Sequence, residues 1–312
     1  MYIIGNGFMG AQNSHRNLIE KICWCYYIEN LTQEQIAKRF SISRLKVVSL
    51  MQEARELNTV TFTINKTKES HSDLEISISD KYKLDDAFIV PTPKDSKSIN
   101  EIIGLAASNW LNMRLQSDSV ISIGYGNTVS YTVNALAAGS QSSWSAISLT
   151  GGVNCYLPNT RSDIFKAKLY LYPAPLLVSS STLKDELMKH PDAVWINKMG
   201  KTSSMTVFGL GGLNEGATVI NNGLFDYNEF IYLKRIGAVG DILGHFINAY
   251  GEIVDAELDR RLISTPLNEL KERAVTVGVA GGPDKVEIIR AALLAGFVRI
   301  LITDEQTAKD LL

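Results

Sequence analysis

The chain has 312 residues, 45% of them hydrophobic and 21% charged, and a net charge of −2, which fits a short module joined to a larger globular domain. No segment approaches the ~20 apolar residues that a membrane-spanning helix needs, and residues 1–14 lack the basic region and apolar run of a signal peptide. The three cysteines, Cys23, Cys25 and Cys155, are too few for a disulfide framework and lack the spacing of metal ligands. We therefore expect a cytoplasmic protein without membrane contact, in which residues 1–14 form a mobile leader.

Charge is distributed unevenly along the chain. Residues 1–66 carry eight Lys or Arg and five Glu, a net charge of +3, so the remaining residues carry a net charge of −5. A positive end on a mildly acidic body suits a protein that contacts nucleic acid at one end only.

The segment from Gln33 to Gln52, QEQIAKRFSISRLKVVSLMQ, predicts two helices joined by a short turn. Small Ala37 falls where the two helices would cross, and a first helix from about Arg16 to Ile28 would pack behind them. This pattern is typical of a helix-turn-helix unit, which places its second helix in the major groove of DNA. An ordinary amphipathic hairpin is the alternative, and the local positive charge disfavours it. The positions that such a unit buries are Ile36, Phe40, Ile42, Val47 and Leu50.

Polar residues between these apolar positions are the candidate DNA contacts. Most of them fall at the start and on the outer face of the second helix, where base edges and phosphates are reached. Ser43 is also a plausible N-cap, and Ser41 occupies the turn position that often carries a left-handed glycine. The candidates are Gln33, Ser43, Arg44, Lys46 and Ser49.

We assign residues 15–66 to a DNA-binding domain and residues 67–312 to a second domain that binds an effector and forms oligomers. Residues Val60 to Ile64 alternate like a strand, and the polar stretch from Asn65 to Ser72 is the predicted linker.

Beyond the linker, apolar runs alternate with amphipathic helices, which predicts a doubly wound, Rossmann-like α/β domain with a parallel sheet. Near Gly244 the run GHFINAYGEIVD predicts an inserted hairpin with its turn at Ala249–Gly251. The predicted strands lie near Ala87, Val120, Ala146, Met205, Ala274 and Arg299. Four helices are predicted: one over 99–115, one that begins at 129, one over 285–294, and a last one that ends at 311.

Four of the apolar runs end in glycines, which predicts a ligand crevice at the carboxyl edge of the sheet. The first loop, Gly124, Gly126, Asn127 and Thr128, leads into a helix whose N-terminal N–H groups suit an anion. The second is Thr150, Gly151 and Gly152, the third is 209–212, and the fourth ends in Lys285, which could hold a phosphate. For each loop the alternative is a tight turn where only Gly fits.

Asp241 follows another glycine-rich run and could accept hydrogen bonds from sugar hydroxyls, although a turn cap or helix N-cap is an equal alternative. The four histidines are scattered and form no metal-ligand pattern, and no nucleophile motif is present. We therefore assign no catalytic residue, no metal site and no cofactor.

Taken together, these residues closely resemble the SorC family of bacterial sugar-responsive transcription regulators, which includes regulators of sorbose and autoinducer-2 operons. The resemblance runs from about Leu18 to Leu312. Its stretches, in family order, are LTQEQIAKRFSISRLKV, ISIGYGNTVS, SLTGGV, YPAPLLVSS, GAVGDILGHF, VGVAGGPDKVEIIRAAL and LITDEQTAKDLL.

The resemblance implies a large domain folded like sugar-phosphate isomerases and deaminases, a phosphorylated sugar or sugar-alcohol effector, and dimers or tetramers bound to operator DNA. Arg44 and Lys46 match family basic positions, Asp241 matches an acidic ligand contact, and Lys285 matches the phosphate-side lysine. The two glycine loops at 124–128 and 150–152 match the family's ligand loops. Val48 and Ser49 stand where the family often has Ser-Arg, so we expect a different operator.

The leading hypothesis is a transcriptional regulator of a carbohydrate-utilisation operon, specifically a repressor, whose operator affinity a phosphorylated effector controls. The alternative is a sugar-phosphate isomerase or deaminase with a helical appendage, in which Asp241 would be the acid or base. The sequence places no second titratable partner near Asp241, which disfavours the enzyme.

Overall fold

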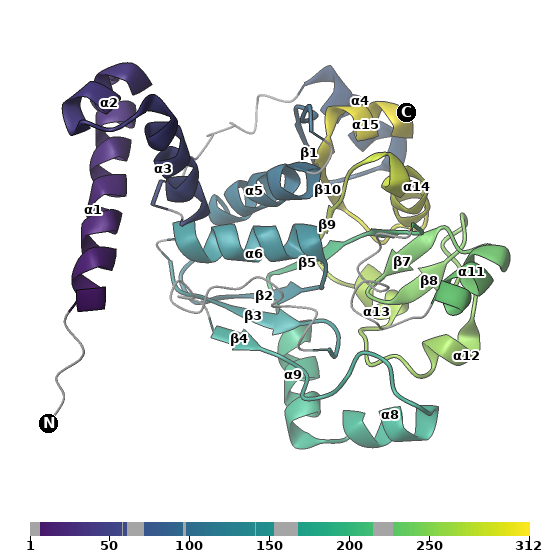
Figure 1. The fold of residues 1–312 in the computed structure, drawn as a ribbon. Helices are drawn as coiled ribbons and strands as arrows, with labels where there is room; N and C mark the ends of the chain where they lie inside the picture. Colours follow the sequence, from purple (N-terminus) through teal and green to yellow (C-terminus); the bar gives the residue numbers. More distant parts are fainter. Residues whose placement is uncertain are drawn as a thin grey trace, which may run out of the picture. The chain divides into compact units, whose positions relative to one another are not determined.

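The computed structural model describes residues 7–57, 59–60, 72–95, 98–140, 142–152, 168–214 and 227–312. The chain divides into two compact units, Met1–Asn65 and Lys66–Leu312 (Figure 1). Apart from Val60 and Ser72, the strand and linker predicted between the units lie outside the described residues, as does Cys155. None of the described helices is long and apolar enough to cross a membrane.

The described part of the first unit contains three helices: α1 Gly7–Tyr27, α2 Gln33–Phe40 and α3 Arg44–Glu56. Its core joins Ile19 and Ile22 of α1 to Ile36 of α2 and to Val47 and Leu50 of α3, all five fully buried. The burial pattern predicted for the two-helix segment is therefore confirmed at its central positions. Helix α1 begins at Gly7, earlier than the predicted start near Arg16, so it takes in residues 7–14 of the predicted leader.

Short polar side chains define the ends of α2 and α3. Thr32 and Gln35 form a capping box at the start of α2. Ser41 ends α2 in the left-handed conformation, with φ 53° and ψ 41°, and two residues later the Ser43 hydroxyl accepts a hydrogen bond from the Lys46 N–H at 3.1 Å. Both backbone predictions for this turn are confirmed, and the tight turn sets the direction in which α3 leaves α2.

The second unit is built on a seven-stranded sheet with the order β1-β10-β9-β5-β2-β3-β4, in which every pairing is parallel. The sheet runs outward from β2 to β3 and β4, and then returns to β5 on the other side of β2. This reversal confirms the predicted doubly wound α/β fold. The strands are β1 Asp86–Val90, β2 Ser119–Ile123, β3 Trp144–Ser148, β4 Lys168–Tyr170, β5 Met205–Gly209, β9 Thr276–Val279 and β10 Ile300–Asp304.

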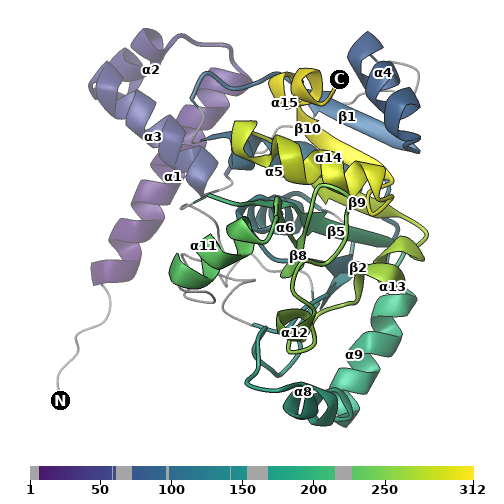
Figure 2. The same ribbon diagram turned by 90° about the vertical axis from the view of Figure 1, so that its right-hand side faces the viewer.

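Helices cover both faces of this sheet (Figure 2). Alternation along β10 shows the two faces, because Ile300 and Ile302 join the core under α5 and α6, whereas Leu301 joins the core under α4, α14 and α15. The helices are α4 Asp73–Tyr82, α5 Ile99–Asn112, α6 Asn127–Gly139, α8 Ser181–Met188, α9 Pro191–Lys201, α11 Tyr227–Arg235, α12 Ala256–Asp259, α13 Leu267–Lys271, α14 Val286–Leu294 and α15 Glu305–Leu311, with a 3₁₀ turn at Pro283–Lys285.

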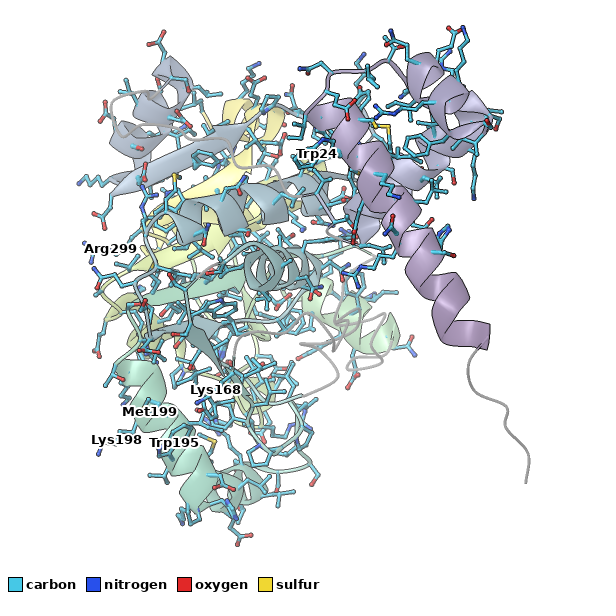
Figure 3. The ribbon with its side chains drawn as sticks, turned by 90° about the vertical axis from the view of Figure 1, so that its left-hand side faces the viewer. Trp24, Lys168, Trp195, Lys198, Met199 and Arg299 are labelled. Atoms are coloured by element: carbon cyan, nitrogen blue, oxygen red, sulfur yellow. The ribbon has the colours of Figure 1, made fainter. Side chains whose placement is uncertain are left out.

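The outer strand β4 is partly covered by α9. The ring of Tyr170 on β4 meets the ring of Trp195 on α9 edge to face, with 5.0 Å between centroids. Lys168 begins the strand and is exposed; Figure 3 labels it together with Trp195 and Lys198 of α9. An aromatic cover and an exposed lysine are ordinary means of preventing an outer strand from pairing with another chain.

A three-stranded antiparallel sheet, β6 Gly211–Gly212, β7 Gly240–Ile242 and β8 His245–Ile247, follows the carboxyl end of β5. Strands β7 and β8 form a hairpin that was not predicted, with its turn at Leu243–Gly244, where both residues have positive φ. The predicted hairpin with its turn at Ala249–Gly251 is also present: the Gly251 N–H donates to the Asn248 carbonyl, and the Ile247–Ile253 bridge and the bond from the Asn248 N–H to the Glu252 carbonyl join its two arms. The β7–β8 hairpin matters because its Leu243–Gly244 turn holds Asp241.

Candidate functional site

A cavity of about 350 Å³ lies where the loops after β2, β5 and β9 meet the β7–β8 hairpin. Strands β2 and β5 are neighbours in the sheet, and the chain leaves them toward opposite sides, so their loops part and leave a crevice. The size is near the lower end of the ~300–1,000 Å³ typical of small-molecule sites. The lining residues are Ile99, Asn100, Tyr125–Thr128, Gly209–Gly212, Asn214, Asp241, Leu243 and Gly281–Lys285.

One part of the cavity wall is suited to an anion. Gly126 has φ 119°, a conformation that L side chains rarely adopt, and it lets the loop turn directly into the first residues of α6. Lys285 contributes its ammonium group, which donates a hydrogen bond to Asn100 Oδ1 at 3.0 Å. Burial of the ammonium lowers the pKa of Lys285 to about 8, and Asp241 and Asp284 oppose this shift.

Asp241 is a buried carboxylate in the same wall. Its Oδ2 accepts hydrogen bonds from the Tyr125 hydroxyl at 2.8 Å and from the Gly244 N–H at 3.0 Å. Burial raises its pKa, while Tyr125, Gly244, His245 and Lys285 oppose the rise. Gly211 has to be glycine here, since a Cβ at that position would collide with Asp241 Oδ1.

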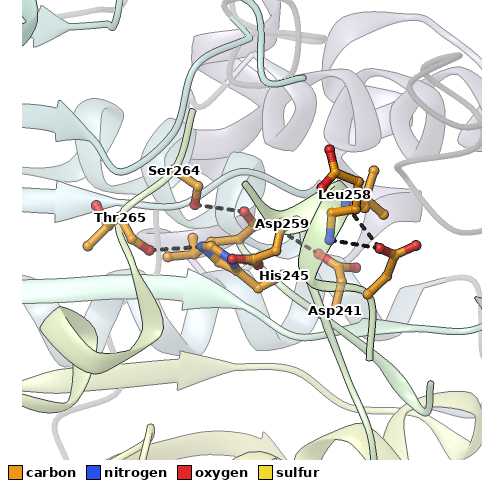
Figure 4. A network of polar contacts seen from close by, with 10 residues as sticks. Asp241, His245, Leu258, Asp259, Ser264 and Thr265 are labelled. Carbon is orange, nitrogen blue, oxygen red and sulfur yellow. Dashed lines mark hydrogen bonds and ion pairs between the residues drawn. The ribbon is translucent and has the colours of Figure 1, made fainter. Parts of the chain in front are cut away.

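His245 anchors β8, which pairs with the strand β7 that carries Asp241 (Figure 4). Its Nδ1 lies 2.5 Å from Asp259 Oδ1 and its Nε2 lies 3.0 Å from the Thr265 carbonyl. The ring is therefore held through both of its nitrogens, by one contact on each side. Ser264 adds a hydrogen bond to the Leu243 carbonyl at 2.9 Å, so the turn beside Asp241 is held from two sides.

The structure brings together five of the nine predicted effector residues: Gly126, Asn127, Thr128, Asp241 and Lys285 all line the cavity. The third loop, at Gly209–Gly212, also lines it, as its sequence suggested.

The other four predicted effector residues are not among the lining residues of this cavity. Gly124 lies under the loop, where an added Cβ would stand 2.8 Å from Leu243 and 2.9 Å from Phe208, so its small size serves packing. In the second loop, the N–H groups of Gly151 and Gly152 already donate to the carbonyls of Ile263 and Ala174, and buried Thr150 is bridged to Ser264. These backbone bonds use the donors that an anion would need.

Sequence reasoning missed Asn100 and Tyr125 as members of the site. Asn100 lies near the start of α5, outside any glycine-rich loop, and no local pattern distinguishes it from other polar helix residues. Tyr125 lies between two glycines already singled out, so its position was available as a signal. Its hydroxyl reaches Asp241, which is 116 residues later in the chain.

In the first unit, the exposed face of α3 carries three of the five residues predicted to contact DNA; Ser43 is its N-cap, and Gln33 begins α2. Arg44, Lys46 and Ser49 are exposed, and Arg44 Nε donates to Gln33 Oε1 at 3.3 Å. Two apolar side chains stand among them: Leu45 is 82% exposed and Val48 is 39% exposed. They were not among the predicted contacts, although the spacing of the buried positions already placed them on the outer face.

Acidic partners do not neutralise this face. On α2, Lys38 pairs with Glu34 and Arg39 pairs with Glu29. Across the described residues, neither Arg44 nor Lys46 forms an ion pair, and no group of three or more His, Cys, Asp or Glu could hold a metal ion.

Comparison with known proteins identifies the family. Residues 66–312 match the Sugar-bind family model, which describes a sugar-binding domain. The transcriptional regulator LsrR of Enterobacter sp. (strain 638) is 30% identical over 309 residues, 98% of this chain and 95% of that protein, and LsrR of Klebsiella pneumoniae is 30% identical over 312 residues, 98% of this chain and 96% of that protein. The chain belongs to the SorC family of transcriptional regulators.

Solved structures show the same fold. The full-length sorbitol operon regulator SorC from Klebsiella pneumoniae has a TM-score of 0.69 at 23% identity, over 95% of this chain and 98% of that one. A DeoR family transcriptional regulator from Listeria monocytogenes has a TM-score of 0.68 at 24% identity, over 77% of this chain and 98% of that one.

Membership of the SorC family decides between the two hypotheses. The structure does place titratable groups near Asp241, namely Lys285 and His245, which the sequence did not reveal. The relatives are nevertheless transcriptional regulators, so this chain is a sugar-responsive regulator rather than a sugar-phosphate enzyme.

Proposed function

We propose that this SorC family regulator binds operator DNA through the exposed face of α3, and that a phosphorylated sugar or sugar alcohol in the cavity changes its operator affinity. The observation that carries the proposal is the composition of the cavity wall. A lysine ammonium and a helix N-terminus, which suit a phosphate, stand beside a buried carboxylate, which suits sugar hydroxyls.

Recognition of DNA would divide between two kinds of side chain on α3. Arg44 and Lys46 supply positive charge for phosphates or for guanine, and no carboxylate in the described part of the chain pairs with either. Leu45 and Val48 offer exposed apolar surface of the kind that contacts the methyl group of thymine. We therefore infer an operator half-site that includes thymines, and Ser43, Ser49 and Gln33 would add polar contacts.

Control requires that the effector bind the operator-competent and operator-incompetent states with different affinity. In this proposal the cavity supplies that difference, because its wall joins loops after three strands and a hairpin held by His245. Repression as the direction of control, and assembly into dimers or tetramers, stay predictions.

Operator binding and effector response can be measured together. The protein is titrated onto fluorescently labelled DNA from the region upstream of its operon, and anisotropy is recorded with and without phosphorylated hexoses, pentitols, hexitols and phosphorylated autoinducer-2. We expect specific binding, which at least one phosphorylated compound changes tenfold or more by the usual size of allosteric coupling, about 1–3 kcal/mol. Absence of specific DNA binding, or an equal response to the unphosphorylated sugars, would contradict the proposal.

A further inference from the structure

Asn100 connects two elements of the cavity wall through a single atom. Its Oδ1 accepts a hydrogen bond from Lys285 Nζ at 3.0 Å and another from Thr128 Oγ1 at 2.8 Å. Lys285 comes from the loop after β9 and Thr128 from the first turn of α6, so the amide oxygen joins segments that are 157 residues apart in the chain. Asn100 itself lies in the first turn of α5.

The two donors fix the orientation of the Asn100 amide. An ammonium group only donates, so the amide atom facing Lys285 has to be the oxygen, and the NH₂ group has to point the other way. Asn100 lines the cavity, and among the described residues its Nδ2 has no hydrogen-bond partner. Two N–H donors are therefore available on a residue of the cavity wall.

Counting donor hydrogens in the same way limits the hydrogen bonds that Thr128 can make to a ligand. A threonine hydroxyl has one hydrogen, and Thr128 donates it to Asn100, so toward a ligand Thr128 can only accept. Lys285 keeps two further N–H donors after its bond to Asn100. The donors that this side offers to an anionic oxygen include Lys285, Asn100 Nδ2, the Asn127 side-chain amide and the N–H groups at the start of α6.

We propose that Asn100 is a specificity-determining residue of the effector site: its Oδ1 positions Lys285, and its Nδ2 donates to an anionic oxygen of the effector, of the phosphate-monoester class. This assignment rests on the proposed function. It replaces Thr128 by Asn100 as the side-chain donor that assists Lys285, and it makes the first turn of α5 part of the site.

Inorganic phosphate is the probe, because it carries the anion without the sugar. Its affinity is measured by isothermal titration calorimetry at pH 7.5 for the full-length wild type and for Asn100→Asp, Asn100→Ala and Lys285→Ala. Asn109→Asp, nine residues further along α5 and outside the cavity lining, adds the same charge as a control. The melting temperature of each variant reports whether it is folded.

Asn100→Asp keeps an acceptor for Lys285 but replaces the NH₂ donor with an anion, so phosphate affinity should fall by about 100-fold. Asn100→Ala removes the donor without adding charge, and a loss of about tenfold is expected. Asn109→Asp should bind phosphate like the wild type. The pH profile adds a readout that a purely structural role would not move: the loss of phosphate binding at alkaline pH should shift to higher pH in Asn100→Asp, where the new carboxylate holds the Lys285 proton.

The outcomes separate the two claims. If Lys285→Ala abolishes phosphate binding while both Asn100 variants bind like the wild type, the role of Asn100 is wrong and the proposed function stands. If Asn109→Asp is as impaired as Asn100→Asp, the loss reflects general charge on α5 and the role of Asn100 is also wrong. If folded wild-type protein binds no phosphate at millimolar concentration, the proposed anion site is wrong, and the proposed role of Asn100 is wrong as well.

Discussion

The two units of the molecule build their candidate sites in opposite ways. In the first unit, the proposed DNA-binding face is a stretch of one helix, and Arg44 to Ser49 follow one another in the chain. In the second unit, the cavity wall gathers residues from position 99 to position 285, and its key hydrogen bonds join residues 28, 116 and 185 positions apart. A contiguous site depends on exposed side chains, whereas an assembled site depends on the fold that places them.

This difference predicts how each site responds to mutation. A residue on the exposed face of α3 acts mainly through its own contact with DNA, so losses there should be graded and nearly independent. A residue of the cavity wall supports its neighbours, because Lys285, Asn100, Thr128, Tyr125 and Asp241 share hydrogen bonds or electrostatic coupling. Losses in the cavity should therefore be larger and non-additive.

The largest expected effect is on the cavity. Lys285→Ala removes the enclosed ammonium, and truncating one member of a buried charged contact typically costs about 2–5 kcal/mol of binding. We expect sugar-phosphate affinity to fall by 100-fold or more in a calorimetric titration, while operator binding without effector persists. Lys309→Ala, an exposed lysine on α15, is the matched control and should respond to effector like the wild type. A Lys285→Ala protein released from DNA at the wild-type effector concentration would refute the assignment.

The exposed face of α3 should show a smaller, graded loss. Arg44→Ala should weaken operator binding by about 1–3 kcal/mol if it contacts a base, and Lys46→Ala should lower the slope of log affinity against log salt by about one unit if it contacts a phosphate. Anisotropy titrations at several salt concentrations measure both quantities. Lys21→Ala removes one exposed charge from α1 and should change neither by a comparable amount. Equal losses for all three variants would mean that charge acts without a defined groove contact.

The pH dependence of effector binding follows from Lys285. Its pKa of about 8 lies below the ordinary 10.5, and a phosphate dianion bound beside it restores the proton. Effector affinity should therefore fall as pH rises above about 8, by at most tenfold per pH unit. In the absence of ligand the unfolded state binds more protons between pH 8 and 10.5, so this group makes stability rise with pH over that window. Calorimetry with wild type and Lys285→Met tests the expected fall of effector affinity above about pH 8, which Lys285→Met should not show. The same fall in both proteins would exclude Lys285 as its source.

The smallest expected effect is on stability, at the left-handed residue that ends one helix in each unit. Ser41 ends α2 at φ 53°, and Lys83 ends α4 at φ 56°, each in the left-handed region. Replacing either residue by Gly should raise the free energy of unfolding of its own unit by about 0.5–1 kcal/mol, because Gly adopts this conformation without steric cost. Denaturant titrations followed by fluorescence measure the change. Destabilisation by Ser41→Gly, with stabilisation by Lys83→Gly, would mean that the Ser41 side chain has a favourable role in the turn.

Sequence reasoning went further in the first unit than in the second. Periodicity placed Ile36, Val47 and Leu50 in the core, and local capping chemistry identified Ser43, because both signals come from neighbours in the chain. Parallel strands with glycine at their carboxyl ends also predicted the α/β fold and the loop at Gly126. Thr150–Gly152 stays a prediction that this cavity does not support, because the N–H donors of Gly151 and Gly152 already bond to backbone carbonyls, which the sequence could not show.

Two other misses have different physical causes. Helix α4 was not predicted although Ser72 and Glu75 form a capping box at its start, so a local signal was present and overlooked. Asn100 had no local signal, because its importance arises only when the fold brings Lys285 and Thr128 to the same amide oxygen. Pairings over such separations are visible only in three dimensions.

The central claim is that the cavity and the exposed face of α3 are two halves of one regulator, and thermodynamic reciprocity tests it most directly. The phosphorylated compound that raises the melting temperature most is chosen first. Its effect on operator affinity, and the effect of operator DNA on its own affinity, are then measured with wild-type protein in one buffer. We predict the same factor in both directions, different from one by tenfold or more. A compound that binds the cavity but leaves operator affinity unchanged, with its own affinity unaffected by DNA, would contradict the account.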